Sequence, residues 1–198
     1  MIKNYKDKWH EIKDTTMTTI GKTTGKYPEK DWKIKLLISE HSPIRKLKIS
    51  WKWESIKSWV SVHFVRHKYG IEHWISTRRT DRTGIDRNNL RQDEMVTHEF
   101  EANAQAIINI SRKRMCFQAS KETREAWAEF LDELEKKEPE LRLCCVPEGI
   151  YRGGCPEFNN CGHCGASLEK NSKEDYLNIK KRYENYKNRT GDLNDIKR

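Results

Sequence analysis

The sequence of 198 residues has no apolar run long enough to cross a membrane, and its first residues, Met1-Ile-Lys-Asn-Tyr-Lys6, carry no hydrophobic core of a signal peptide. A membrane-spanning helix needs about 20 consecutive apolar residues, which this chain does not offer. We therefore expect no membrane association and a cytoplasmic protein. In that compartment the six cysteines are expected to be reduced or metal-bound rather than paired in disulfides.

Internal repeats and a complete phosphate-binding loop are also lacking. The segment Gly21-Lys-Thr-Thr-Gly25-Lys has suitable residue types. A phosphate loop, however, needs four residues between its first Gly and the Gly-Lys-Ser/Thr step, and it follows an apolar strand. We interpret residues 1–30 as a flexible N-terminal segment.

Apolar residues are scarce, at 35% of the chain, although seven Trp and seven Tyr provide large side chains. This composition indicates a folded but thin protomer that completes its core or its sites by oligomerising. The formal charge of +9 favours an anionic partner. Nucleic acid, nucleotides and dinucleotide cofactors all meet that description.

Hydrophobic periodicity predicts a strand and several helices. Residues 47–53 alternate large apolar side chains with lysines and a serine, which is the period of a half-buried strand. A helix is expected over about 55–66, and Asn103 is a plausible N-cap of a later helix. A further helix, over about 120–137, places Trp127 and Leu134 on one face and stops before Glu138-Pro139.

Cations gather in residues 66–79, directly after the first of these helices. Arg66, Lys68, Arg78 and Arg79 lie in this stretch together with imidazole and hydroxyl groups. Arginine forks and imidazoles suit phosphate oxygens, so the pattern indicates an anion site. On chemistry alone an ordinary basic surface turn fits the pattern equally well.

The same stretch resembles the signature RHRxxSxNEQSxRY of the flavin-dependent thymidylate synthases. Arg66, His67, Ser76 and Arg78 fall at matching positions, and Lys68 keeps the charge of an arginine. Other landmarks of that family occur in the expected order over about residues 35–135. They are Glu40-His41, Arg87-x-x-Leu90, Asn103-Ala-Gln105, Asn109, Arg114 and Gln118-Ala-x-x-Glu122-x-Arg124.

The resemblance implies an α/β (α+β) homotetramer with an antiparallel or mixed sheet, helices, and active sites between subunits. It implies binding of FAD and dUMP, with NADPH and methylenetetrahydrofolate as co-substrates. The residues implied to hold the flavin are His41, Arg66, His67, Lys68, Asn103, Gln105 and Asn109. Those implied to surround the nucleotide are His63, Arg66, Trp74, Ser76, Thr77, Arg78, Arg87 and Arg114. Arg114 would be catalytic, because a cation over the base stabilises uracil ionised at N3.

Ser76 is a second catalytic candidate. A nucleophile needs a base that activates it, and the sequence shows none for Ser76. A hydroxyl that binds the substrate is therefore preferred over a nucleophile. His73 and His98 are interpreted as ordinary polar residues.

Several positions depart from the family pattern. Trp74 stands where relatives have an acidic residue, Ile71 where they have serine, and Gln105 where they have arginine. Arg79 replaces a tyrosine, and His63 a position that is often glutamine. Divergent members encoded by phages are the natural comparison, which would place the protein in the host cytoplasm. Two alternatives stay open: a hydroxymethylase that makes 5-hydroxymethyl-dUMP, and a basic, zinc-stabilised nucleic-acid-binding protein without catalysis.

The C-terminal third of the chain is distinct from the family-like domain, which is expected over residues 31–140. Residues 141–168 form a Cys/Gly-rich cap, in which Cys155, Cys161, Cys164 and either Cys144 or Cys145 could hold a structural zinc ion; Cys145 is taken as the fourth ligand. Reduced thiols in a packed cap are the alternative. Residues 169–198 form a basic tail, interpreted as a solvated helix rather than one that docks a partner.

Overall fold

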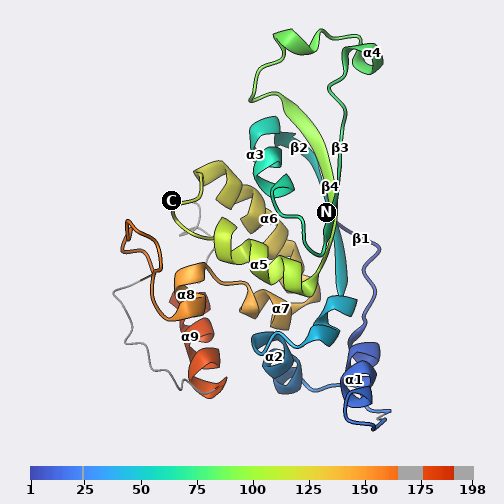
Figure 1. Cartoon of the computed structure of the whole chain (residues 1–198), viewed down its shortest axis with the longest axis vertical. Helices are drawn as coiled ribbons and strands as arrows, with labels where there is room; N and C mark the ends of the chain where they lie inside the picture. Colours follow the sequence, from blue (N-terminus) through green and yellow to red (C-terminus); the bar gives the residue numbers. More distant parts are fainter. Residues whose placement is uncertain (24, 165–175, 190–198) are drawn as a thin grey trace.

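The protein is described by a computed structural model over residues 1–23, 25–164 and 176–189, and its centre is a four-stranded antiparallel sheet (Figure 1). The strands are β1 (Ile2–Lys3), β2 (Lys48–Lys57), β3 (Ile71–Ile75) and β4 (Met95–Asn103), in the order β1-β2-β4-β3. The mixed α/β class predicted from the sequence is therefore confirmed.

The two faces of the sheet differ sharply. Trp51 and Trp53 of β2 pair with Phe100 and His98 of β4, and all four side chains are buried on one face. The opposite face carries cross-strand ion pairs, such as Lys48 with Glu101 at 2.9 Å. The alternation that predicted a half-buried strand is confirmed, and the helices cover its apolar side.

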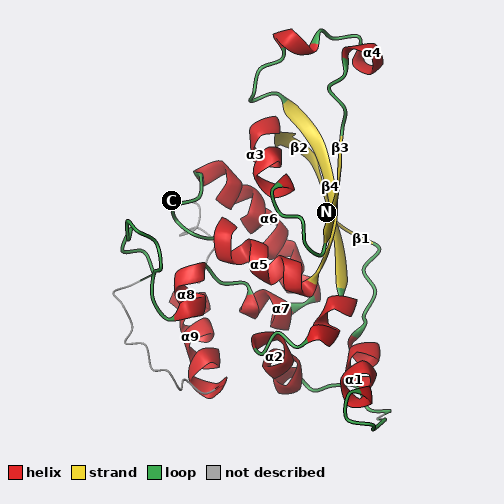
Figure 2. Cartoon of the chain, viewed as in Figure 1, coloured by secondary structure: helices red, strands yellow, loops and turns green. Residues whose placement is uncertain are grey.

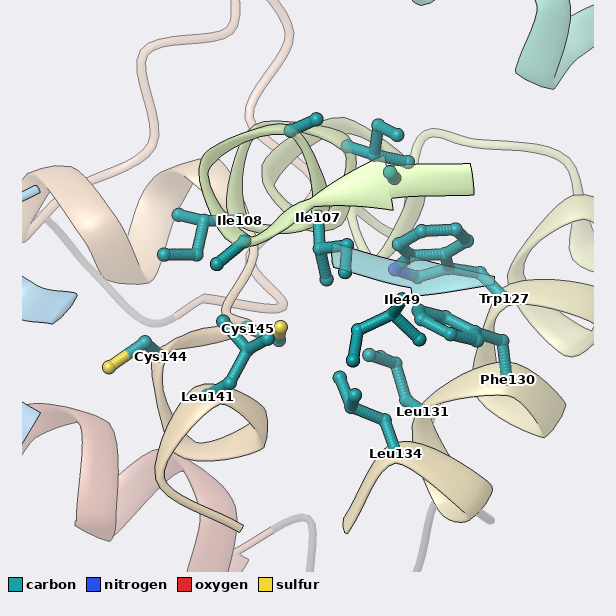
Figure 3. Close-up of a cluster of buried hydrophobic side chains, with 14 of the residues drawn as sticks. Ile49, Ile107, Ile108, Trp127, Phe130, Leu131, Leu134, Leu141, Cys144 and Cys145 are labelled. Atoms are coloured by element: carbon teal, nitrogen blue, oxygen red, sulfur yellow. The ribbon is translucent and has the colours of Figure 1, made fainter. Parts of the chain in front are cut away.

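Three helices pack on the apolar face: α3 (Ser58–Val65), α5 (Ala104–Arg114) and α6 (Lys121–Lys137) (Figure 2). The α6 helix was predicted at nearly these bounds, and its buried stripe includes Trp127, Phe130 and Leu134. Figure 3 shows Ile49 of the sheet close to this stripe and to α5. The expected helix over 55–66 begins later, because β2 continues through Lys57 and α3 starts at Ser58.

The N-terminal residues differ from the expected flexible segment. They contain β1 and α1 (Trp9–Thr18), and α2 (Lys30–Ile38) follows. Trp9 and Ile12, one turn apart, are both fully buried. Trp9 Nε1 donates to the buried Glu138 carboxylate at 2.8 Å, and Tyr5 donates to the same group at 2.5 Å. These contacts join the first residues of the chain to the end of α6.

The C-terminal third is also more ordered than predicted. Short helices α7 (Pro139–Cys144) and α8 (Glu148–Arg152) replace the irregular cap, and residues 141–150 are all buried. Helix α9 (Tyr176–Arg189) packs against α2, α7 and α8, and its Tyr183 and Tyr186 are only 3% exposed. The interpretation of this part of the tail as a solvated helix is therefore wrong. The rest of the cap and tail, 165–175 and 190–198, lies outside the described residues.

The remaining elements are short. They are the 3-10 helices η1 (Ser42–Lys46) and η2 (Arg87–Asn89) and the single turn α4 (Thr80–Thr83), which Gly84 ends with a φ of 71°. Within the described residues, no helix has the length and apolar character of a membrane span.

Candidate functional site

The C-terminal ends of α3 and α5 bring together the residues for which the sequence predicted the central chemistry. Arg114 Nε donates to His67 Nε2 at 3.0 Å, and Arg114 Nη2 donates to the His63 carbonyl oxygen at 2.6 Å. Arg66 is close enough to lower the pKa of Arg114, after burial, which is the main cause. We call His63, Arg66, His67 and Arg114 the core cation group.

Both histidines of this group favour the neutral form. Burial, and then the positive charge of Arg114, lower the pKa of His67 to about 4. The same two causes, in the same order, lower the pKa of His63, whose Nδ1 lies 2.9 Å from the Thr123 hydroxyl. Neutral His67 accepts from Arg114 through Nε2, so the positive charge near neutral pH belongs to the arginines.

The turn that carries Arg66 and His67 is held against α5 at a second point. Asn103 donates its backbone N–H to Gly70 O at 2.9 Å, and its Oδ1 accepts from Ala106 N at 2.9 Å as the N-cap of α5. A Cβ at Gly70 would lie 2.5 Å from Asn103 Nδ2, and its φ is 72°. Asn103, predicted to hold the cofactor, therefore fixes the position of the signature turn, and its predicted capping role is confirmed.

A chain of hydrogen bonds runs beneath this turn. Ser61 Oγ lies 3.0 Å from His98 Nδ1, His98 Nε2 lies 2.9 Å from His73 Nδ1, and His73 Nε2 lies 3.1 Å from the His67 carbonyl oxygen. Burial is the main reason that the pKa of His98 falls to about 4 and that of His73 is also lowered. The buried His98 and the partly buried His73 thus form a network that links β3 and β4 to the signature turn.

Two other predicted cofactor residues belong to a separate group around Glu40. Gln105 Nε2 donates to Glu40 Oε2 at 2.5 Å, and Arg112 forms an ion pair with the same carboxylate. Arg112 Nη1 also donates to Asn109 Oδ1 at 3.0 Å. Sequence reasoning missed Arg112, although its spacing of three and seven residues from Asn109 and Gln105 is that of one helix face. His41 follows Glu40 with an exposed side chain.

Half of the predicted nucleotide residues lie on the long connection between β3 and β4, residues 76–94, which we call the arm. Arg78, Arg79, Arg87 and Leu90 line a pocket of about 370 Å³. Arg78 is oriented by bonds to Ser58 Oγ and Arg91 O, both at 2.8 Å. The pocket includes the predicted Arg78 and Arg87, while Arg79 and Leu90 were not predicted to bind the nucleotide.

The hydroxyls at the start of the arm have structural partners. Ser76 Oγ accepts from Thr97 N at 3.0 Å, and Thr77 Oγ1 accepts from Arg79 N at 3.2 Å. Among the described residues, no His, Asp or Glu side chain is hydrogen bonded to the Ser76 hydroxyl. This arrangement favours a binding or positioning role for Ser76 over a nucleophilic one.

The arm and the core cation group are separate within one chain. Figure 1 shows the arm extending beyond the end of the sheet. No hydrogen bond or ion pair of the described chain joins Arg78, Arg79 or Arg87 to the core cation group. The chain therefore presents two cationic surfaces rather than one closed site.

Two departures from the signature have clear positions. Ile71 is 6% exposed and pairs with Ala102, so it contributes to the core. Trp74 pairs with Glu99, whose side chain lies on the charged face of the sheet, and Trp74 is 55% exposed. Trp74, predicted to contact the nucleotide, thus lies on the sheet face opposite the helices that carry the core cation group.

The predicted zinc ligands are not assembled as a set. Cys145 is fully buried, and Figure 3 shows its side chain pointing away from that of Cys144 and toward α5. Burial raises the pKa of the Cys145 thiol to about 11, against a hydrogen bond with Ser111 that lowers it. Within 1–23, 25–164 and 176–189, no three His, Cys, Asp or Glu side chains stand in positions to hold a metal ion.

The chain was compared with protein-family models, with curated proteins and with solved structures, and none of them matches it. The resemblance to the flavin-dependent thymidylate synthases thus stays a prediction. It depends on the signature residues and on the contacts that those residues make.

Proposed function

We propose that the protein is a flavin-dependent thymidylate synthase that transfers a one-carbon unit from methylenetetrahydrofolate to C5 of dUMP. One observation carries this proposal: Arg114 and His67, 47 residues apart and both predicted site residues, are hydrogen bonded at 3.0 Å. The expected product is dTMP, with FAD as cofactor and NADPH as reductant.

Arg114 suits the task of stabilising negative charge on the base. A guanidinium keeps its charge even when burial lowers its pKa, because its ordinary pKa lies far above neutral pH. Nε and Nη2 are engaged by His67 and His63, whereas Nη1 makes no hydrogen bond to the described residues. That Nη1 can donate to an oxygen of ionised uracil, where a positioned cation lowers the energy of developing charge.

The turn after α3 suits the cofactor. Arg66 and Lys68 are exposed, and neither forms an ion pair within the described part of the chain, so both can bind the pyrophosphate of FAD. His67 adds a neutral ring beside them. When bound, the flavin supplies the redox chemistry, and the residues of this turn bind and orient it.

The arm suits the phosphate of dUMP, since three arginines line its pocket. Every side chain from 76 to 94 is exposed or only partly buried, and no hydrogen bond or ion pair of the described residues joins the arginines of the pocket to the core cation group of the same chain. We therefore propose that the arm of one subunit completes the site of another subunit in a homotetramer. A site between subunits explains why two cationic surfaces lie apart in a single chain.

The purified protein tests the proposal directly. We expect it to be yellow, to release FAD on denaturation, and to convert dUMP with methylenetetrahydrofolate and NADPH. Mass analysis of the product separates dTMP from 5-hydroxymethyl-dUMP. A colourless protein that does not bind dUMP and binds oligonucleotides in a salt-dependent manner would refute the enzyme proposal. It would support the alternative of a nucleic-acid-binding protein.

The role of Arg114 is tested by Arg114→Ala. This variant loses a hydrogen-bond donor directed at the negative charge that develops on the uracil base, so we expect kcat to fall by about 100- to 1000-fold. We expect the variant to retain FAD. Lys113→Ala is the matched control, because Lys113 is the preceding residue of α5 and its side chain is 56% exposed. Equal loss of FAD and turnover in Arg114→Ala would show that Arg114 organises the site rather than acting on the substrate.

A further inference from the structure

Two cysteine-bearing segments that are distant in sequence pack against each other beyond the end of α5. The ring of Phe117 stacks on that of His163, with centroids 4.7 Å apart and planes at 19°. Gln118 Nε2 donates to Asn159 O at 2.9 Å. Cys116 immediately precedes these two residues, so it lies beside the loop of residues 154–164, which carries three further cysteines.

Two cysteines of that loop meet at the first turn of α8. A Cβ at Gly149 would lie 2.8 Å from Cys164 Sγ and 3.5 Å from Cys155 Cα. Cys155 and Cys164 are therefore neighbours on the same helix surface, and the glycine leaves space for the Cys164 side chain. Cys161 is exposed in the loop between them.

Cys116 lies within electrostatic range of this loop. Burial is the main cause that raises the pKa of the Cys116 thiol, and Cys161, Glu157 and Cys155 raise it further. Cys145, which the sequence suggested as the fourth ligand, is instead directed into the core toward Ser111. The fourth thiol near the loop is thus Cys116, a residue that was not assigned from sequence.

The turn that carries Cys116 is anchored independently of the loop. The guanidinium of Arg124, a residue that is 5% exposed, donates to Phe117 O at 2.7 Å and to Ala119 O at 2.9 Å. The same guanidinium lies 4.3 Å from the centroid of the Phe117 ring. A buried cation beside this turn also favours a neighbouring site that carries negative charge.

We propose that Cys116, Cys155, Cys161 and Cys164 bind one zinc ion, which ties the loop of residues 154–164 to the end of α5. Zinc prefers four sulfur or nitrogen ligands in a tetrahedron, and closed sets of four thiolates are typical of structural sites. The described residues do not hold any three of these thiols in ligand positions, so the loop of residues 154–164, which contains no helix or strand, closes toward Cys116 when the ion binds. Each thiol releases its proton on binding, so affinity rises with pH.

The site depends on neither the flavin nor dUMP, so its test is separate from that of the enzyme. Full-length protein without an affinity tag is purified under reducing conditions, incubated with one equivalent of zinc, passed through a desalting column and analysed for bound metal. We expect one zinc ion per chain. With cobalt in place of zinc, we expect the visible absorption bands of a tetrahedral thiolate site.

Single substitutions identify the ligands. Cys161→Ser, at an exposed position, should reduce bound zinc at least tenfold without changing the melting temperature of the metal-free protein. Cys116→Ser should do the same, whereas Cys145→Ala should retain one zinc ion per chain. Wild-type protein that binds no zinc would overturn the proposal, and so would a Cys116→Ser variant that keeps it. If Cys145→Ala does not fold, the Cys116→Ser and Cys161→Ser results decide.

Discussion

The core cation group and the arm are both rich in positive charge, yet they are built in opposite ways. In the first, Arg114 is half-buried and bonded to residues of α3, and α5 beneath it packs on the sheet. In the second, Arg79 and Arg87 are exposed, and no described side chain between 76 and 94 is buried. The first surface is shaped by the packing of the fold. The second has no buried side chain and is joined to the start of α3 by a few hydrogen bonds, such as that of Ser58 N with Glu94 O.

This difference indicates how a ligand would meet each surface. The core cation group is organised before anything binds, so little ordering opposes binding there. The arm holds Arg78 by two hydrogen bonds but leaves its other arginines to solvent or to local acidic partners, as in the pair of Arg79 with Asp81. A second protein surface that closes over this pocket would therefore strengthen ligand binding there.

The largest difference should appear in folding stability. Leu134 is fully buried in α6, and Leu134→Ala should lower the free energy of unfolding by about 2–5 kcal/mol. Ile85 on the arm is 55% exposed, and Ile85→Ala should change it by less than about 0.5 kcal/mol. Urea unfolding followed by tryptophan fluorescence measures both values.

The same experiment at two protein concentrations sharpens the comparison. If Ile85→Ala lowers the free energy of unfolding only at high protein concentration, another subunit covers the arm. If it lowers this free energy by more than about 1 kcal/mol at both concentrations, Ile85 is packed within its own chain, and the description of the arm as unpacked is contradicted.

A smaller effect is expected from acid, and it should originate in the buried histidines rather than the arm. The pKa of His98 in the folded protein is about 4, below the ordinary value of 6.5. Between these two pH values His98 is protonated in the unfolded chain but stays neutral in the folded chain. Stability is therefore complete above pH 6.5 and falls as the pH drops toward 4, by up to about 3 kcal/mol for this residue.

The His98→Asn variant isolates this contribution. It should be less stable than the wild type at pH 7, because contacts with Ser61 and His73 are lost or weakened. It should also lose less stability than the wild type between pH 6.5 and 4.5. Equal acid sensitivity in the two proteins, measured by thermal unfolding across this range, would contradict a neutral His98.

The smallest effect concerns binding by the arm. Arg87→Ala removes a cation that lines the pocket and should weaken dUMP binding by about 10- to 100-fold, the range for a charge-assisted hydrogen bond. Arg82→Ala is the matched control, because it removes the same charge from the same arm outside the pocket lining. Its effect on affinity should be within about twofold, since long-range charge is screened at 0.15 M salt. Equal weakening by both variants in calorimetric titrations would show that only net charge attracts the nucleotide.

Local patterns predicted several elements well. The alternation around Trp51, the buried face of α6 and the cap at Asn103 each depend on a few neighbouring residues. The N-terminal segment was misjudged because its polar composition hid the two anchors Trp9 and Ile12, which lie one turn apart. Trp9 is hydrogen bonded to Glu138, 129 residues away, and no local pattern reveals that contact.

The sequence by itself determined the residue types of the candidate site, the helical spacing of α5 and the abundance of cations, because these are properties of short stretches. Tertiary packing decided that Arg114 meets His67 while Arg112 meets Glu40, so one helix serves two groups. It also decided that Cys145 faces the core, whereas Cys116 lies beside the cysteine loop. The physical reason is that these contacts join segments tens of residues apart, and only the packing of helices on one face of the sheet brings them together.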